Sequence, residues 1–144
     1  IDMHFMTNDF PELLEKLLNQ NNNISKASFH AESNSINRFL NEMSKQSNIE
    51  TGVGVLGTSN LNILNNFIHN EKFNIDYILL LCVNPGFSNQ KPFISPVERV
   101  KEFKLLFPNY EGEVMVDGGV TDIMLEELKE LGVDISVQGG AIFG

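Results

Sequence analysis

The chain has 144 residues and a mass of 16.2 kDa, which corresponds to one ordinary domain or to part of a larger one. Hydrophobic residues make up 42% of it, so it can bury a core, while a formal charge of −9 without a basic cluster argues against nucleic acid as a partner. We expect neither a membrane span nor a signal peptide. The single cysteine, Cys82, fits a reducing compartment, and we therefore expect a cytoplasmic protein.

Short apolar or β-branched runs alternate with longer segments of helical periodicity from one end of the chain to the other. This alternation predicts parallel strands that are joined by helices. The predicted strands cover residues 1–6, 24–29, 51–56, 77–83, 113–116 and 135–138.

Residue types that commonly begin helices precede each helical segment. They are Asn8 or Asp9, Ser33 or Ser35, Ser59, Ser95 before Pro96, and Thr121. Apolar residues then recur at helical spacing, for example Ile36, Phe39, Leu40 and Met43. Gly132 is expected to end the last helix.

Two architectures accommodate such a repeat: the doubly wound open sheet and the (βα)8 TIM barrel. One strand for about every 24 residues favours the barrel, because eight such units need about 190 residues. We therefore predict that residues 1–144 are a single partial TIM-barrel domain with about six βα units. Six strands cannot close a barrel of eight, so we expect the first two units to precede Ile1.

Polar residues and glycines gather where the predicted strands end, which is where active sites of parallel βα folds lie. Asp117 ends a strand directly before Gly118 and Gly119, and Gly139 and Gly140 follow the last strand. Backbone N–H groups at such glycine pairs can hold a phosphate. The alternative is that these glycines only form turns and helix caps.

His4 and Asp117 suit a metal site or acid–base chemistry, since imidazole and carboxylate both bind divalent cations and exchange protons. A buried, hydrogen-bonded histidine and a capping aspartate are the alternatives. Two ligands do not complete a catalytic metal site. His30 and Glu32 share one face and could orient neighbouring groups, or they could be a solvated loop edge. Cys82 is expected mid-strand and inert.

Five segments, in this order and spacing, resemble the ribulose-phosphate 3-epimerase family. They are Asp-Met-His-Phe-Met at 2–6, Phe-His-Ala-Glu at 29–32, Val-Asn-Pro-Gly-Phe at 83–87 followed by Gln90, Val-Asp-Gly-Gly-Val at 116–120, and Gly-Gly-Ala-Ile-Phe at 139–143. The resemblance aligns the whole chain with the third to eighth strands of that family's barrel. It implies an isomerase that interconverts ribulose 5-phosphate and xylulose 5-phosphate through an ene-diolate, with proton transfer at C3.

The resemblance also implies site residues. Asp117 would be the catalytic acid–base and, with His4, a ligand of one divalent cation (zinc, iron, manganese or cobalt) that polarises the substrate. The residues implied to contact substrate or phosphate are His4, Met6, Gly86, Phe87, Ser88, Asn89, Gly118, Gly119, Gly139 and Gly140. A homo-oligomer is expected as well.

The chain also departs from the family. The first two strands, which supply a serine, a histidine and the second catalytic aspartate, have no counterpart in it. Ser88 and Asn89 replace a usual Gly-Gly pair, Gly140 stands where serine is common, and the segment 52–58 lacks the usual Asn-Pro. An epimerase for a hexulose 6-phosphate such as allulose 6-phosphate, or a non-catalytic sugar-phosphate-binding relative, therefore remains an alternative.

Overall fold

The computed structural model describes residues 1–9, 12–19, 23–84 and 91–138. Within them the chain forms one six-stranded sheet in sequence order, and every pair of neighbouring strands is parallel. The strands are β1 (Asp2–Phe5), β2 (Lys26–His30), β3 (Glu50–Val55), β4 (Tyr77–Leu81), β5 (Glu113–Asp117) and β6 (Ile135–Val137). Each of the six predicted strands is confirmed, with its bounds shifted by two residues at most.

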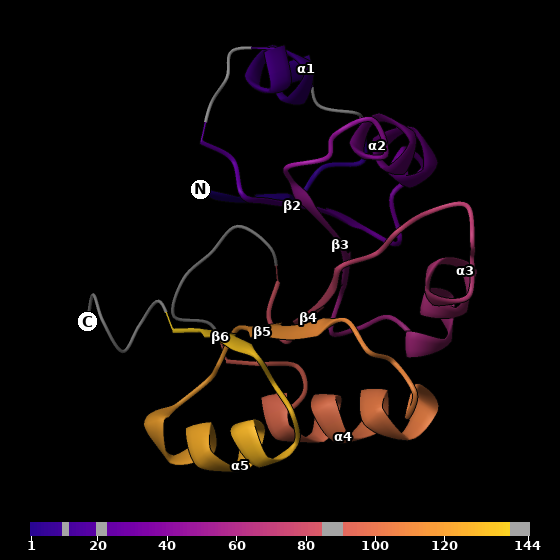
Figure 1. Ribbon diagram of the computed structural model, residues 1–144. Coiled ribbons are helices and arrows are strands. Elements are labelled where there is room, and N and C mark those ends of the chain that lie inside the picture. The colour runs from indigo at the N-terminus through magenta and orange to yellow at the C-terminus, as the bar shows by residue number, and fades with distance from the viewer. Residues whose placement is uncertain (10–11, 20–22, 85–90, 139–144) are drawn as a thin grey trace.

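The sheet curls, and the helices lie around its outside (Figure 1). The helices are α1 (Glu12–Asn19), α2 (Ile36–Met43), α3 (Asn65–Ile68), α4 (Pro96–Leu106) and α5 (Leu125–Glu130), with 3-10 turns η1 (Leu61–Leu64) before α3 and η2 (Asp122–Met124) before α5. Strands β1 and β6 are the two outer strands of the sheet. This half-barrel, with a helix between successive parallel strands, confirms the predicted partial (βα)8 barrel.

The outer face of the sheet carries most of the core. Val53, Val55, Ile78 and Val116 on the strands are fully buried, together with apolar side chains of the helices such as Phe39 and Phe103. The predicted stripe of α2 is confirmed, because Ile36, Phe39, Leu40 and Met43 are all buried. Burial of these apolar faces is the main driving force that holds the helices on the sheet.

The inner, concave face is formed by the alternate residues of the strands. Tyr77, Leu79, Leu81 and Met115 make a second apolar cluster there, and Ile135 packs against it. Because side chains alternate along a strand and parallel pairing keeps the faces in register, His4, Ser28 and Gly52 share this face with Tyr77. The functional candidates therefore lie on the inside of the curl.

Two sequence predictions need correction. The helix after β3 begins with η1 and is capped by Asn60, whose side chain accepts a hydrogen bond from the Asn62 N–H; Ser59 is not the cap. Cys82 lies directly after β4 and not inside it, although it is fully buried. Thr121, by contrast, is confirmed as the start of the last helical segment, because it is the N-cap of η2, which runs directly into α5. Short 3-10 turns are common at helix starts and are hard to recognise from apolar spacing.

Candidate active site

His4 is the centre of a chain of polar side chains on β1 and β2. Its Nδ1 lies 2.7 Å from Ser28 Oγ, and its Nε2 lies 3.0 Å from His30 Nε2. The two imidazole rings are 4.7 Å apart between centroids and tilted by 57°. Gly54 on β3 makes room for this arrangement, because a Cβ at that position would come within 2.9 Å of His4 Cε1.

The environment keeps His4 neutral. Burial, and then the neighbouring His30, lower the pKa of His4 to about 3. A neutral imidazole has one nitrogen that donates a proton and one with a free lone pair, which is the form that binds metal ions. The predicted role of His4 as a ligand is chemically compatible with this state, and its place on the inner face agrees with it.

His30 and Glu32 extend the chain away from His4. His30 is 6% exposed, and its Nδ1 lies 3.6 Å from Glu32 Oε2. Glu32 Oε1 accepts a hydrogen bond of 2.9 Å from the Leu56 N–H. Burial opposes ionisation of Glu32, but its contacts with His30, Ser59 and the Leu56 N–H outweigh burial and lower its pKa to about 2. The sequence allowed His30 and Glu32 either to orient neighbouring groups or to lie at a solvated loop edge. The burial of His30 excludes the solvated edge for this residue.

Asp117 ends β5 on the same inner face as Met115 and pairs in register with Leu81 of β4. Burial raises the pKa of its carboxyl, while a hydrogen bond from the Gly118 backbone opposes that shift. A carboxyl whose pKa is moved towards neutrality can take up and release protons more readily near pH 7. The position of Asp117 agrees with the acid–base prediction but does not test it.

Gly118 and Gly119 occupy a tight turn directly after Asp117. Their φ angles are +98° and +74°, in the left-handed region that side chains rarely adopt. A Cβ on Gly118 would come within 2.5 Å of Val83 Cγ2, and a Cβ on Gly119 within 2.7 Å of Pro92 Cγ. The turn therefore requires glycine for its own geometry, which supports the turn alternative without excluding the predicted phosphate contact.

Met6 follows β1 and is 47% exposed. It lines a small hollow of about 130 Å³ together with residues of the loops after β1, β2 and β3. The lining residues are Met6, Thr7, Asn8, His30, Glu32, Ser33 and Leu56. The hollow opens at the carboxyl ends of these strands, the edge at which the sequence places the site.

The structure thus places two groups of predicted residues. His4 and Met6 lie on or directly after β1, and Asp117, Gly118 and Gly119 lie at the end of β5. Gly86, Phe87, Ser88, Asn89, Gly139 and Gly140 lie outside the described residues.

Sequence reasoning missed Ser28 and Gly54. Ser28 precedes His30 by two residues on one strand face, and Gly54 lies two residues from Gly52, so a period-two pattern was the available signal.

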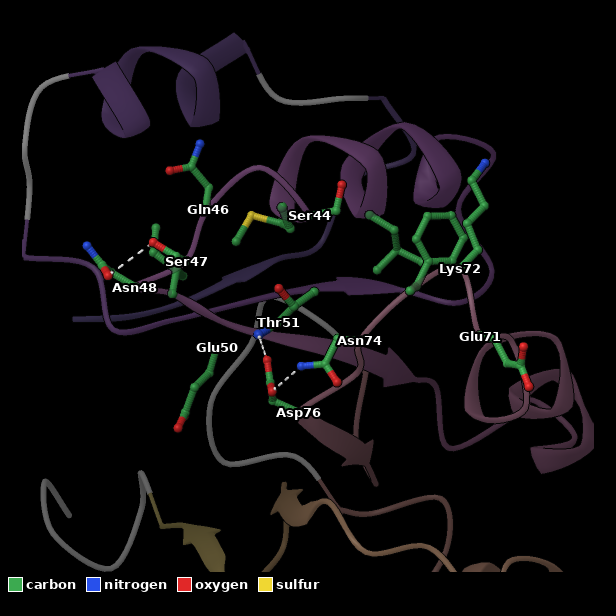
Figure 2. A pocket seen from close by; sticks show the side chains of 14 residues that line it. Ser44, Gln46, Ser47, Asn48, Glu50, Thr51, Glu71, Lys72, Asn74 and Asp76 are labelled. Atoms are coloured by element: carbon green, nitrogen blue, oxygen red, sulfur yellow. Dashed lines mark hydrogen bonds between the residues drawn. The ribbon is translucent and has the colours of Figure 1, made fainter.

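A larger hollow of about 570 Å³ lies at the opposite edge of the sheet, beside the start of β3 (Figure 2). Its polar groups bind each other: Asp76 accepts hydrogen bonds from the Thr51 N–H at 2.7 Å and from Asn74 Nδ2 at 2.8 Å. Side chains at the amino ends of barrel strands mostly serve stability. We therefore place the site at the carboxyl ends, although the hollow there is smaller.

The donors on the inner face suit a divalent cation but form only part of a site. His4 is neutral, so one of its ring nitrogens carries a lone pair that can bind a metal ion, and Asp117 supplies a carboxylate. In the described residues, however, no three or more His, Cys, Asp or Glu side chains are grouped to hold a metal ion. Further ligands would have to come from elsewhere.

Cys82 does not contribute a reactive thiol. It is fully buried, and burial raises the pKa of its thiol to about 12. Thiols in such surroundings are poor nucleophiles, which agrees with the predicted inert role.

Comparison with known proteins gives a consistent result. A family model described as the ribulose-phosphate 3 epimerase family matches residues 1–143. The protein named ribulose-phosphate 3-epimerase from Helicobacter pylori strain J99 is 31% identical to this chain, over 99% of this chain and 64% of that protein. The protein of the same name from Buchnera aphidicola subsp. Baizongia pistaciae is 32% identical, over 99% of this chain and 61% of that protein. The protein of the same name from Aquifex aeolicus is 31% identical, over 100% of this chain and 63% of that protein. The chain thus spans 61% to 64% of the length of these curated relatives.

In the described part of the chain, no helix combines the length and the apolar character needed to cross a membrane.

Proposed function

The chain belongs to the ribulose-phosphate 3 epimerase family, and from this premise we propose that its protein interconverts D-ribulose 5-phosphate and D-xylulose 5-phosphate by moving the proton at C3. The observation that carries the proposal is that a neutral, partly buried imidazole and a strand-end carboxyl lie on the same inner face of the sheet, at the carboxyl ends of parallel strands. That edge is where barrels of this architecture place their chemistry.

Asp117 is the proposed acid–base at C3. Its carboxyl ends β5, and the raised pKa favours exchange of a proton with a weak carbon acid more than an ordinary surface aspartate would. The opposite face of C3 needs a second group, which these residues do not supply. The proposal therefore concerns the full-length protein.

His4 and Asp117 are the proposed residues of this chain that would hold a divalent cation. When bound, such a cation supplies Lewis-acid stabilisation of negative charge on the substrate oxygens. His4 and Met6 are also proposed to contact the substrate, and Met6 lines the hollow at the carboxyl ends of β1 to β3 with an apolar, polarisable side chain. Zinc, iron, manganese and cobalt all remain candidates.

The glycine turns are the proposed phosphate and sugar contacts. Gly118 and Gly119 bring backbone close to the strand ends at the left-handed turn after Asp117. Gly86, Phe87, Ser88, Asn89, Gly139 and Gly140 complete this proposed set. Backbone N–H groups rather than cationic side chains would hold the phosphate, since Lys129 is the only basic residue from Gly112 onwards.

The test is exchange of solvent deuterium into C3 of each sugar phosphate, followed by proton NMR with the full-length protein. We expect exchange with xylulose 5-phosphate that is faster than with allulose 6-phosphate at equal concentration. A large preference for the six-carbon sugar would replace the pentulose assignment. Binding of the sugar phosphate without any exchange, in protein loaded with each of the four metals, would favour the non-catalytic alternative.

The homo-oligomer, the cytoplasmic location and the single partial domain over residues 1–144 stay predictions. Sedimentation of the full-length protein measures the first of these directly. We expect a particle mass that is a small multiple of the chain mass.

A further inference from the structure

His30 and Glu32 are not needed for the proposed chemistry, yet they form the most unusual contact inside the curl. In the described residues, His30 Nδ1 and Glu32 Oε2 are buried and have no hydrogen-bond partner, and they face each other at 3.6 Å. Buried polar atoms without a partner are rare in proteins and destabilise the folded state. Such a pair calls for a physical explanation.

The second carboxylate oxygen of Glu32, Oε1, is held by a backbone hydrogen bond. It accepts the Leu56 N–H from the loop after β3 at 2.9 Å, and the contacts of Glu32 keep this carboxylate ionised despite burial. A carboxylate can only accept hydrogen bonds. The atom of His30 that faces it, Nδ1, is therefore favoured as the nitrogen that carries the proton.

The proton on His30 decides the state of His4. In a neutral His30 with its proton on Nδ1, Nε2 carries the lone pair and can only accept. His4 Nε2, 3.0 Å away, must then donate its own proton. His4 Nδ1 is left as the acceptor, and the Ser28 hydroxyl at 2.7 Å donates to it. Donors and acceptors are then aligned in one direction, from the Ser28 hydroxyl through both rings to the Glu32 carboxylate.

We propose that Glu32, acting through His30, selects which ring nitrogen of His4 carries the proton, so that both are positioning residues for His4. The geometry of the four side chains carries this inference: with both rings neutral, three contacts in a row each have one possible direction once the carboxylate is fixed. Neither His30 nor Glu32 is thereby a catalytic residue, since each acts through His4. The consequence for turnover, unlike the proton position itself, rests on the proposed epimerase function.

The proton position can be read directly by NMR. Long-range proton–nitrogen spectra of full-length protein labelled with ¹⁵N-histidine show which ring nitrogen of each histidine is protonated. The metal is removed first with a chelator, because a bound cation would itself occupy a ring nitrogen. Single substitutions such as His69→Gln assign the signals. We expect the proton of His4 on Nε2; a proton on Nδ1 would overturn the inference without any variant.

Glu32→Gln is the decisive variant. The Gln oxygen keeps the acceptor for the Leu56 N–H, so its NH2 group faces His30 Nδ1 and forces that nitrogen to accept. The whole chain of hydrogen bonds then reverses, and we expect the proton of His4 to move to Nδ1. An unchanged proton position in a folded Glu32→Gln protein would overturn the inference.

Glu42→Gln is the matched control. Glu42 lies on α2 in an ion pair with Lys45 at 2.8 Å, away from the two rings. We expect the His4 spectrum of this variant to equal that of the parent, and a change there would show that the readout is not specific to Glu32.

The kinetic readout separates this inference from the proposed function. For C3 exchange by the metal-loaded protein we expect Glu32→Gln to lower the rate by about 10- to 100-fold, which is typical for partners that orient a metal-binding histidine. If the parent protein shows no exchange, the proposed function fails while the proton position still tests the inference. If the parent exchanges and the His4 proton does not respond to Glu32, only the inference fails.

Discussion

The two ends of the strands use their polar groups differently. At the amino ends, Asp76 and Asp134 each precede a strand and accept a hydrogen bond from a backbone N–H of the neighbouring strand, at 2.7 Å and 2.8 Å. At the carboxyl ends, His30 Nδ1 and Glu32 Oε2 are buried without partners in the part of the chain that the structure describes.

The two ends of the strands also differ in how their charged groups are held and in the backbone conformation beside them. Near the amino ends, Lys26 binds Glu50 and Glu113 at once and so ties β2 to β3 and β5 across the inside of the curl. At the carboxyl end of β5, burial raises the pKa of Asp117, and two left-handed glycines follow it.

The polar groups at the amino ends stabilise the fold, whereas those at the carboxyl ends lower its stability. Groups that are paired locally hold a fold together, whereas unpaired buried groups and left-handed turns persist where they serve function. Tyr110, near the amino ends, is the exception, because its hydroxyl is buried without a hydrogen-bond partner in the described residues. We therefore expect substitutions at the two ends to affect different quantities.

The largest effect is expected for Asp117→Asn in the full-length protein. Loss of a positioned acid–base group typically costs about 10²- to 10⁴-fold in rate. Solvent deuterium exchange at C3 measures it, with the circular dichroism of the variant as a check of folding. Asp122→Asn is the control, because this exposed carboxylate binds only Gln138 in the described contacts. Asp117→Asn activity within a few fold of the parent would remove Asp117 from the proposed site.

Next in size is Gly118→Ala. The left-handed backbone and the approach to Val83 together predict a loss of about 2–4 kcal/mol in the free energy of unfolding. Urea denaturation of the full-length protein measures this loss. Gly132→Ala is the matched control with φ +81°, where the new Cβ meets only the flexible Lys104 side chain. We expect about 1 kcal/mol there, and equal losses would show that the crowding at Gly118 is unimportant.

Asp134→Ala tests the amino ends. It removes the acceptor of the Val114 N–H and should lower the free energy of unfolding by about 1–2 kcal/mol. Since Asp134 is remote from the proposed chemistry, kcat for C3 epimerisation should stay unchanged. A drop in kcat larger than the loss of folded protein explains would contradict the division between the two ends.

The smallest effect is a pH dependence at Glu32. Its pKa is lowered from 4.5 to about 2, so its stabilisation is present above pH 4.5 and is lost as the pH falls towards 2. Glu32→Gln should lower the free energy of unfolding by about 1 kcal/mol at pH 7, after allowance for solvent screening. Denaturation curves at several pH values should show this difference closing below pH 4.5. A difference that persists at pH 2 would mean that the charge of Glu32 is not its source.

The fold followed from periodicity because its elements are regular. Alternating apolar runs located all six strands within the described residues, and Gly132 and the Ser95-Pro96 pair marked helix ends correctly. The cap at Asn60 was missed because Ser59 carries an equally good side chain one residue earlier. Local chemistry alone does not choose between two such neighbours.

The candidate site was only partly predictable. Asp117 and the glycines after it stood out because they end a strand, and His4 stood out with the family resemblance. The contact of His4 with His30 joins residues 26 apart in sequence and depends on strand register, which a single sequence does not reveal. The opening that Gly54 leaves for the His4 ring is likewise a property of packing between strands.

The strict sequence order of the strands bears on how the chain folds. Among the described residues each strand pairs only with its neighbours in the sequence, so every pairing can form as soon as one βα unit follows another, as in a repeat protein. The bond from Lys26 to Glu113 is different, because it joins positions 87 residues apart. Contacts of such separation form late, since a long loop must close first. We therefore expect the N-terminal units to assemble during synthesis and the curl to tighten last, when β5 arrives beside Lys26.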